Sequence, residues 1–402
     1  MSELKVSLLN RRFFCGIVLI FIVILAVAYP YRTFLTESGG SVEGPAWMAV
    51  FIYGVSGTVL CKTVCFKSAA VGVSVLFRRR LLCGNTDFTY SGCGAVSCEV
   101  HRKEADRMIR KICLIAGQNF SGWHRNARIW LTFTLGLVLC LMLSDQMLTR
   151  AQTYDAAIQI FEPFIWTFGD TESVLLSTLL LLVLFADMPF IDQVAPYRLV
   201  RTTREIWLAG QVVYVALSVI VYDLFLLIAE SLIAMPWAYT GNVWSETSAA
   251  FAYSGEGSGA VPVSLKTMEM STPYACTLMV FLLMLLYSLF IASLMLFLNL
   301  TAGSAAGVVG ALLINLYGYL LNPDLLQKIF DIPATLLYRA NVLCGWLSLL
   351  RHATFPLHNF GYDYLPRISV SVMIFLILTA VLLILSGVRM RNYNFTFIQV
   401  EE

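Results

Sequence analysis

Two long apolar runs flank the polar stretch Asp192-Gln-Val-Ala-Pro-Tyr-Arg-Leu-Val-Arg-Thr-Thr-Arg-Glu-Ile-Trp207. The run before it covers Ser173–Phe190, and the run after it covers Trp207–Ile233. Each approaches or exceeds the length of about 20 apolar residues that a helix needs to cross the hydrocarbon core of a bilayer. The pattern predicts two transmembrane helices joined by a short polar connection.

The connection carries its charge as arginines spaced by three residues, Arg198, Arg201 and Arg204. This spacing places them on one face of a short amphipathic helix, with the rings of Tyr197 and Trp207 at its ends. Arginines beside a span mark the cytoplasmic side of a membrane, and tyrosine and tryptophan favour its interface. We therefore expect a basic helix at the inner membrane surface, suited to docking with a cytoplasmic partner.

The composition of the whole chain agrees with a membrane protein. Hydrophobic residues make up 58% of the 402 residues and charged residues 13%, and the mean hydropathy is +0.76. A soluble protein of this length would need far more charge to cover its surface. The net charge of +2 gives no indication of nucleic-acid binding. We expect an all-α polytopic membrane protein.

About eight transmembrane helices are expected from apolar runs long enough to cross a bilayer. These runs are Phe13–Pro30, Ala46–Cys61, Ile129–Leu148, Ser173–Phe190, Trp207–Ile233, Tyr274–Leu298, Ala302–Leu321 and Ile368–Val388. The region 333–351 is also apolar, but Arg339, Asn341 and Arg351 interrupt it. We expect a re-entrant or interfacial helix pair there, because such polar groups are tolerated at membrane depth only where protein or water surrounds them.

Lysine and arginine placement predicts the orientation of the chain in the membrane. Basic residues gather at both termini, in Phe66–Arg128 and in the connection at 192–207, so we place all four in the cytoplasm. The segments Thr149–Glu172 and Pro236–Pro273 contain one basic residue each, and we place them outside. Asn322–Arg367 is also expected outside, although it carries four basic residues.

The first part of the chain differs in character from the rest. Residues 1–61 predict an N-terminal transmembrane hairpin, and residues 62–107 predict an irregular cytoplasmic linker rich in Cys, Ser, Gly and Arg. Another interpretation is that two coding segments have been joined near Met108. The spacings Cys61-x3-Cys65 and Cys93-x4-Cys98 are not the C-x2-C of common zinc sites, so we expect no metal.

From Met108 to Phe395 the chain resembles the membrane subunits of type-2 ATP-binding-cassette (ABC) exporters of Gram-positive bacteria. Five segments carry the resemblance: Glu162-Pro-Phe-Ile-Trp-Thr-Phe-Gly-Asp170, Leu184-Phe-Ala-Asp-Met-Pro-Phe190, Arg201-Thr-Thr-Arg-Glu-Ile-Trp-Leu-Ala-Gly-Gln211, His352-Ala-Thr-Phe-Pro-Leu-His-Asn-Phe-Gly361 and Arg389-Met-Arg-Asn-Tyr-Asn-Phe395. No single segment is a strict motif, and the resemblance rests on their order and on the topology.

The resemblance implies a six-helix permease core over residues 108–395, with a coupling helix at 192–207 and re-entrant helices before the last span. It also implies a bacterial plasma membrane location and partners, namely a separate ABC ATPase subunit, a second permease subunit in a homo- or heterodimer, and membrane lipids. The chain has no G-x-x-x-x-G-K-[ST], H-E-x-x-H or G-x-S-x-G motif, so we expect no catalysis and no cofactor of its own.

Several residues are candidates for a role in such a protein. Arg198, Arg201, Arg204 and Trp207 would couple the chain to the ATPase, or would simply anchor it at the inner surface. Asp223 and Glu230 lie seven residues apart, on one face of a span, and would line a translocation path or pair with neighbouring helices. Small residues allow helices to approach closely, in this chain or between two copies, at Gly303, Gly307 and Gly310. We expect structural roles for His352 and His358.

Two other functional classes remain open. The chain could be an ion-coupled secondary transporter that uses Asp223 and Glu230 as coupling carboxylates, although no inverted repeat with broken helices is evident. It could also be a non-transporting membrane sensor or assembly protein. The sequence does not indicate which substrate a transport activity would have.

Overall fold

The computed structural model describes residues 93–153, 155–190, 202–254, 263–329, 333, 336–361 and 363–393. The predicted spans Phe13–Pro30 and Ala46–Cys61 lie outside these residues. The described residues from Asp106 onward belong to one compact unit. A helix begins at Cys93, inside the segment 62–107 that was expected to be irregular.

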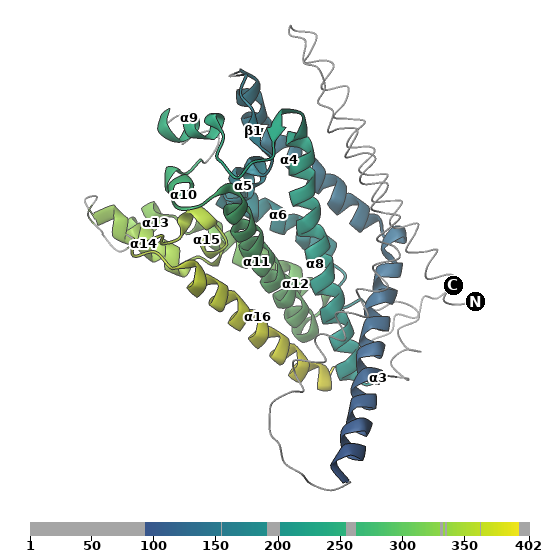
Figure 1. The fold of residues 1–402 in the computed structure, drawn as a ribbon. Helices are drawn as coiled ribbons and strands as arrows, with labels where there is room; N and C mark the ends of the chain where they lie inside the picture. The colour runs from purple at the N-terminus through teal and green to yellow at the C-terminus, as the bar shows by residue number, and fades with distance from the viewer. Residues whose placement is uncertain are drawn as a thin grey trace. The chain divides into compact units, whose positions relative to one another are not determined.

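The described residues are almost entirely helical (Figure 1). In chain order the helices are α3 (Cys93–Ser121), α4 (Ala127–Thr153), α5 (Glu162–Phe168), α6 (Thr171–Leu184), α8 (Arg204–Ala234), α9 (Glu246–Ser254), α10 (Leu265–Met270), α11 (Pro273–Ala302), α12 (Ser304–Leu320), α13 (Pro323–Ile329), α14 (Leu337–Leu347), α15 (Leu349–His352) and α16 (Ile368–Arg391). Three 3-10 turns are η1 (Trp123–Arg125), η2 (Met235–Trp237) and η5 (Phe355–Leu357). Two short strands, β1 (Ile158–Gln159) and β2 (Ala238–Tyr239), pair in parallel.

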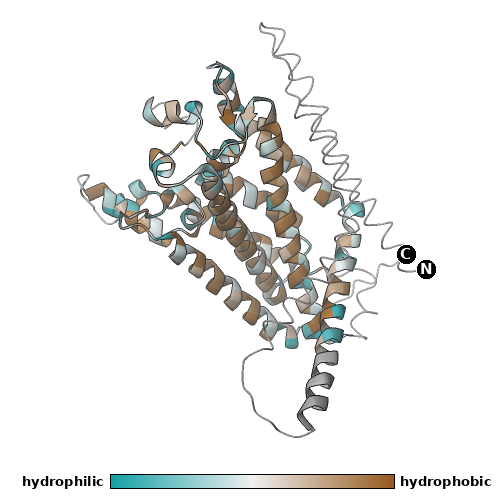
Figure 2. Cartoon of the chain, viewed as in Figure 1, coloured by the Kyte–Doolittle hydropathy of each residue, from teal (hydrophilic) through white to brown (hydrophobic). Residues whose placement is uncertain are grey.

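Four of these helices, α4, α8, α11 and α16, are long and apolar enough to cross a membrane, and α5 with α6 makes a fifth if the bent pair counts as one span. Hydrophobic residues cover α8, α11 and α16 along most of their length (Figure 2). Helix α12 has 17 residues and extends only about 26 Å at 1.5 Å per residue, which is less than the hydrocarbon thickness of about 30 Å. The described residues therefore have the composition of a multi-pass helical membrane protein with four or five spans, and they do not contain eight.

Helix α11 is the centre of the bundle. It packs against α16, α12, α8, α5 and α6, and 72% of its most apolar stretch is buried. In α16, only 11% of the most apolar stretch of the helix is buried. Most of its apolar side chains therefore face outward. Amphipathic α3 lies against the start of α8, where the absent side chain of Gly210 leaves room for Ile115: a Cβ there would lie 2.6 Å from Cγ2 of Ile115.

The expected span Ser173–Phe190 coincides with α6, which ends earlier than expected and is preceded by α5 at a sharp bend. Helices α5 and α6 meet at an angle of 85°. At the bend, a Cβ on Gly169 would lie 2.3 Å from the backbone oxygen of Ile165, and the Asp170 side chain caps α6 by accepting a hydrogen bond from Glu172 N at 3.0 Å. Helix α6 ends at Leu184 because Phe185 leaves the helical conformation. Hydropathy alone registers neither the bend nor this early end.

A break at Gly303 separates α11 from α12. Its φ of +100° lies in the region that favours glycine, so Gly303 ends one helix and starts the next. The two helices then pack tightly, since a Cβ on Gly307 would lie 2.4 Å from Oδ1 of Asn299 and one on Gly310 would lie 2.2 Å from Cδ1 of Leu298. The side chain of Asn299 bridges the break, accepting from Gly307 N at 2.7 Å and donating to Met188 O at 2.7 Å. Gly307 and Gly310 thus face α11 of the same chain.

The region expected to be re-entrant, 333–351, contains α14 and α15. Helix α14 packs against α13, and a small buried cluster joins them through Leu321, Leu326, Ala340 and Cys344. Ser348, between α14 and α15, donates to Gly318 O of α12 at 3.1 Å. These short helices are therefore fixed to the end of α12.

The contact at Gly307 yields a prediction about stability. Replacing Gly307→Ala forces the new Cβ against Asn299 Oδ1 and the backbone of Met295, and overpacking of this kind costs about 1–3 kcal/mol. We expect a lower thermal unfolding temperature for the purified protein in detergent. The matched control is Gly387→Ala in α16, where a Cβ would meet nothing within 4 Å. Equal unfolding temperatures for the two variants would contradict this packing.

Candidate functional site

The predicted coupling helix at 192–207 is described only at its C-terminal end, and Arg198 and Arg201 lie outside the described residues. There it is not a separate helix, because Arg204 and Trp207 belong to the first turn of α8. Thr203 caps that turn by accepting from Ile206 N at 3.4 Å. Trp207 is buried, with 1% of its surface exposed, so it packs inside the bundle and does not lie free at a membrane interface.

The start of α8 is joined to the end of α16. Arg204 Nη1 donates to Arg391 O at 2.6 Å, and Arg391 Nη2 forms an ion pair with Glu205 Oε1 at 3.2 Å. Both side chains of the ion pair are about 70% exposed, and exposed pairs contribute about 0–1 kcal/mol. The bond from Arg204 also satisfies one of the carbonyls that a helix leaves unpaired at its C-terminus. These contacts position the two helix ends relative to one another more than they stabilise the fold.

Asp223 and Glu230 are both fully buried on α8. Glu230 accepts a hydrogen bond from Ser144 Oγ of α4 through one carboxyl oxygen, and its other oxygen has no partner within the described residues. Neither oxygen of Asp223 forms a well-aligned hydrogen bond in the same part of the chain, but the buried Ser288 hydroxyl of α11 lies close enough to interact with this carboxyl group. Both carboxyl groups are therefore enclosed between helices, and they do not line an open path in this conformation.

Buried carboxyl groups at membrane depth are costly unless another group or a ligand compensates them. Asp223 is the least compensated of the polar groups on α8. Its neighbour Tyr222 donates to Ser177 O at 3.0 Å and is satisfied. The side chain of Asp223 can therefore accept a proton or a small cation without losing an existing hydrogen bond.

Two asparagines that sequence reasoning missed hold the bundle together. Asn315 Oδ1 accepts from Thr178 of α6 and from Tyr287 of α11, each at 2.9 Å. Its Nδ2 donates to Ala311 O at 2.9 Å. Asn299 bridges the break between α11 and α12 through its hydrogen bonds to Gly307 N and Met188 O. For Asn315 the available signal was its place inside the predicted span Ala302–Leu321, because an amide in an apolar helix needs partners from its neighbours.

Glu162 was also missed, and it joins the start of α5 to the start of α9. Its carboxyl oxygens accept from Ser245 N at 2.7 Å, Ser245 Oγ at 2.5 Å and Gln159 N at 3.2 Å. Trp166 adds a bond from Nε1 to Ser248 Oγ at 3.0 Å. Ser245 is 83 residues away from Glu162 in the sequence, so the local pattern gives no indication of this pairing. With three hydrogen bonds to its carboxyl oxygens, this group is structural.

His352 and His358 come together around Ser371, at the start of α16. His352 Nδ1 and His358 Nε2 each lie 2.8 Å from Ser371 Oγ. His358 Nδ1 faces the carbonyls of Thr354 and Phe355 at 3.0 and 3.1 Å, so this nitrogen carries the proton and Nε2 accepts from the serine hydroxyl. The cluster fixes the loop after α15 to the last long helix.

Burial disfavours the charged form of both histidines. Burial lowers the pKa of His358 to about 4 and also lowers the pKa of His352. The positive charge of Lys266, which donates to His358 O at 3.0 Å and pairs with Asp363, acts in the same direction on His358. Within the described residues no three His, Cys, Asp or Glu side chains lie together as a metal would need.

This shift gives a pH prediction. An unfolded histidine has a pKa of about 6.5, so between pH 6.5 and pH 4 the unfolded chain binds more protons than the folded chain. Stability should be constant above pH 6.5 and fall by up to about 3 kcal/mol as the pH drops to 4. Thermal unfolding from pH 7.5 to pH 4.5 measures this. In His358→Asn the fall should be smaller, since Asn does not titrate; an unchanged pH profile in that variant would contradict the assignment.

Comparisons with known proteins identify no relative: no protein-family model matches the chain, and neither a curated protein nor a solved structure is significantly similar to it.

Proposed function

We propose that this chain is the permease subunit of an ABC exporter in the bacterial plasma membrane, energised by a separate ATPase and working with a second permease subunit. The order of the described elements supports the proposal. Amphipathic α3 is followed by α4, the bent pair α5–α6, a polar link, then α8, α11 and α12, the short helices α13–α15, and finally α16. The resemblance implies this same order, with a polar link after the second span and short helices before the last.

The observation that carries most of the proposal is the way the polar link meets the bundle. Its described end, Thr202 and the cap residue Thr203, leads directly into α8, a helix of 31 residues and about 46 Å. Helix α8 packs against α4, α11 and α16, and its first turn is bonded to the last turn of α16. A push on the link would therefore move α8 and α16 together against the rest of the bundle, which is what coupling to a motor protein requires.

The sequence of the link is basic, which suits contact with such a motor. Arg198, Arg201 and Arg204 can pair with carboxylates of an ATPase groove, and Arg204 is already oriented by its bond to Arg391 O. ATP binding and hydrolysis would occur on the partner, since this chain carries no phosphate-binding loop. Two copies of the permease, or one copy with a related chain, would enclose the path between them.

Charge reversal tests the proposal. The tagged chain is purified from native membranes in a mild detergent, and co-purifying ATPase is measured by mass spectrometry and by ATP hydrolysis. We expect an ATPase with the wild-type chain and its loss when Arg198, Arg201 and Arg204 are all changed to Glu. The matched control is Lys328→Glu, an exposed basic residue on α13 at the side expected to face outward. Retention of the ATPase by the triple variant would contradict the coupling role.

A second candidate function is ion-coupled transport, and the buried carboxyl of Asp223, which has no well-aligned hydrogen bond within the described residues, favours it. This function requires no ATPase. It predicts proton or sodium flux into liposomes that hold the purified chain alone, and loss of that flux in Asp223→Asn. The exporter proposal predicts no such flux and unchanged ATPase binding by Asp223→Asn. Glu269→Gln, an exposed position on α10, is the control for loss of a carboxylate.

A further inference from the structure

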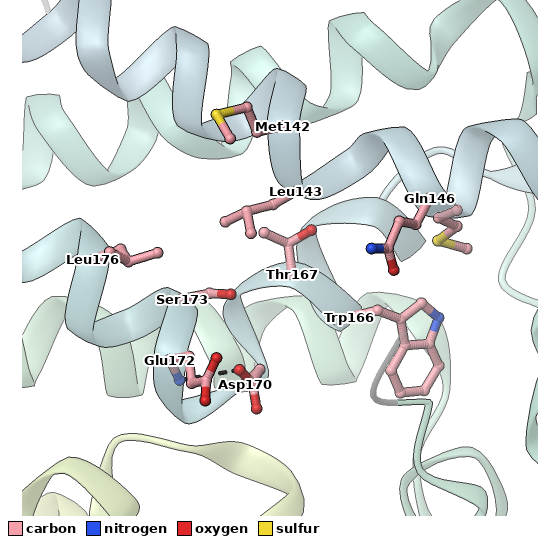
Figure 3. A pocket seen from close by; sticks show the side chains of 10 residues that line it. Met142, Leu143, Gln146, Trp166, Thr167, Asp170, Glu172, Ser173 and Leu176 are labelled. Atoms are coloured by element: carbon pink, nitrogen blue, oxygen red, sulfur yellow. Dashed lines mark hydrogen bonds between the residues drawn. The ribbon is translucent and has the colours of Figure 1, made fainter. Parts of the chain in front are cut away.

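We propose that a cavity between α4 and the α5–α6 bend binds the head group of an amphiphile that carries a primary ammonium. The cavity has a volume of about 180 Å³. Helix α4 lines it from one side with Met142, Leu143, Gln146 and Met147, and the bend lines it from the other with Trp166, Thr167, Asp170, Glu172, Ser173 and Leu176 (Figure 3). The proposal concerns binding alone and does not depend on the proposed ATPase partner.

Two neutral hydroxyl groups mark the cavity as more than a packing defect. Ser173 and Thr167 are buried, with 5% and 7% of their surfaces exposed, and both side chains line the cavity. Neither hydroxyl forms a hydrogen bond within the described part of the chain, whereas the nearby Thr178 and Ser177 hydroxyls do. A buried hydroxyl that faces a cavity without a protein partner needs water or a ligand to satisfy it.

The charged groups at the cavity select the sign of that ligand. Asp170 and Glu172 both line it, and Asp170 uses one oxygen to cap α6 at Glu172 N, which leaves its other oxygen for a ligand. The N-terminus of α6 by itself favours an anion. The Asp170 cap occupies the N–H group of Glu172 there, and the two carboxylates place negative charge at the same point. The net preference is therefore for a cation.

The hydrogen-bonding groups select a primary ammonium over a quaternary one. A primary ammonium donates three hydrogen bonds and accepts none. The residues that line the cavity carry several acceptors, namely the Asp170 and Glu172 carboxylates, the Ser173 and Thr167 hydroxyls, and the Gln146 amide oxygen. A quaternary ammonium has no N–H to give and would leave the hydroxyls unsatisfied.

The remaining walls select an apolar tail. The volume of the cavity equals that of about six water molecules in the liquid, at about 30 Å³ each. It can therefore enclose a head group but not an alkyl chain. Its apolar wall continues to the surface through Met142 and Leu176, which are 70% and 40% exposed. Leu143 lies between them and the polar end in Figure 3. An alkyl chain leaving the cavity would run along α4 beside Met142.

Binding of dodecylamine tests the proposal. The purified full-length chain in phosphatidylcholine nanodiscs is titrated with radiolabelled dodecylamine, and empty nanodiscs give the partitioning background. We expect saturable binding that dodecanol and dodecyl sulfate do not displace. The double variant Asp170→Asn/Glu172→Gln keeps the α6 cap, because Asn also accepts from the backbone, and should bind about tenfold more weakly. Glu269→Gln should bind as the wild type does.

A second variant separates the site from general attraction of a cation to the protein. Ser173→Ala leaves both carboxylates in place and should weaken dodecylamine binding by a few-fold, since it removes one acceptor. Three results would overturn the proposal: no saturable binding above the empty nanodiscs, equal binding by the double variant and the wild type, or displacement by dodecyl sulfate at the same concentration as by dodecylamine.

Discussion

A polar group that a helix carries into an apolar environment must find its partner inside the protein, because hydrocarbon offers none. This constraint accounts for how the bundle is joined. Asn315 ties α6, α11 and α12 together through one carbonyl oxygen, and Asn299 holds the break between α11 and α12 closed. Tyr222 connects α8 to α6 in the same way. Asp223 and Glu230 on α8 meet this constraint least well, because three of their four carboxyl oxygens lack a well-aligned hydrogen bond within the described residues. Where the described residues provide no partner for such a polar group, a proton or a ligand can compensate it.

The positions of long, charge-free apolar helices could be predicted from the sequence. The points at which these helices bend or end could not. The predicted runs Ile129–Leu148 and Tyr274–Leu298 fall inside α4 and α11, because burial of apolar residues over such a length leaves few alternatives to a helix. The bend at Gly169 and the end of α6 at Leu184 depend on backbone conformation, to which hydropathy is blind. Gly303 was grouped with a helix face, whereas its positive φ makes it the break itself. The pairing of Glu162 with Ser245 joins distant segments and leaves no periodic trace.

The two ends of the bundle suggest different tasks. At one end the polar link enters α8, and Arg204 and Glu205 hold the last turn of α16, so a force on the link reaches two long helices at once. At the bend between α5 and α6, Asp170 and Glu172 stand beside hydroxyls that lack protein partners, next to apolar side chains that reach the surface. The first arrangement suits the transmission of movement. The second suits recognition of a molecule that has a charged head and an apolar tail.

The account depends above all on the side of the membrane at which the polar link lies. Labelling of single cysteines measures this directly, in a chain whose ten natural cysteines are replaced by serine or alanine. Thr202→Cys reports on the link, and Glu269→Cys on α10 reports on the opposite side. With a membrane-impermeant maleimide, the account predicts labelling of position 269 in intact cells and of position 202 only in inside-out vesicles. Labelling of position 202 in intact cells would contradict both the topology and the proposed coupling to a cytoplasmic ATPase.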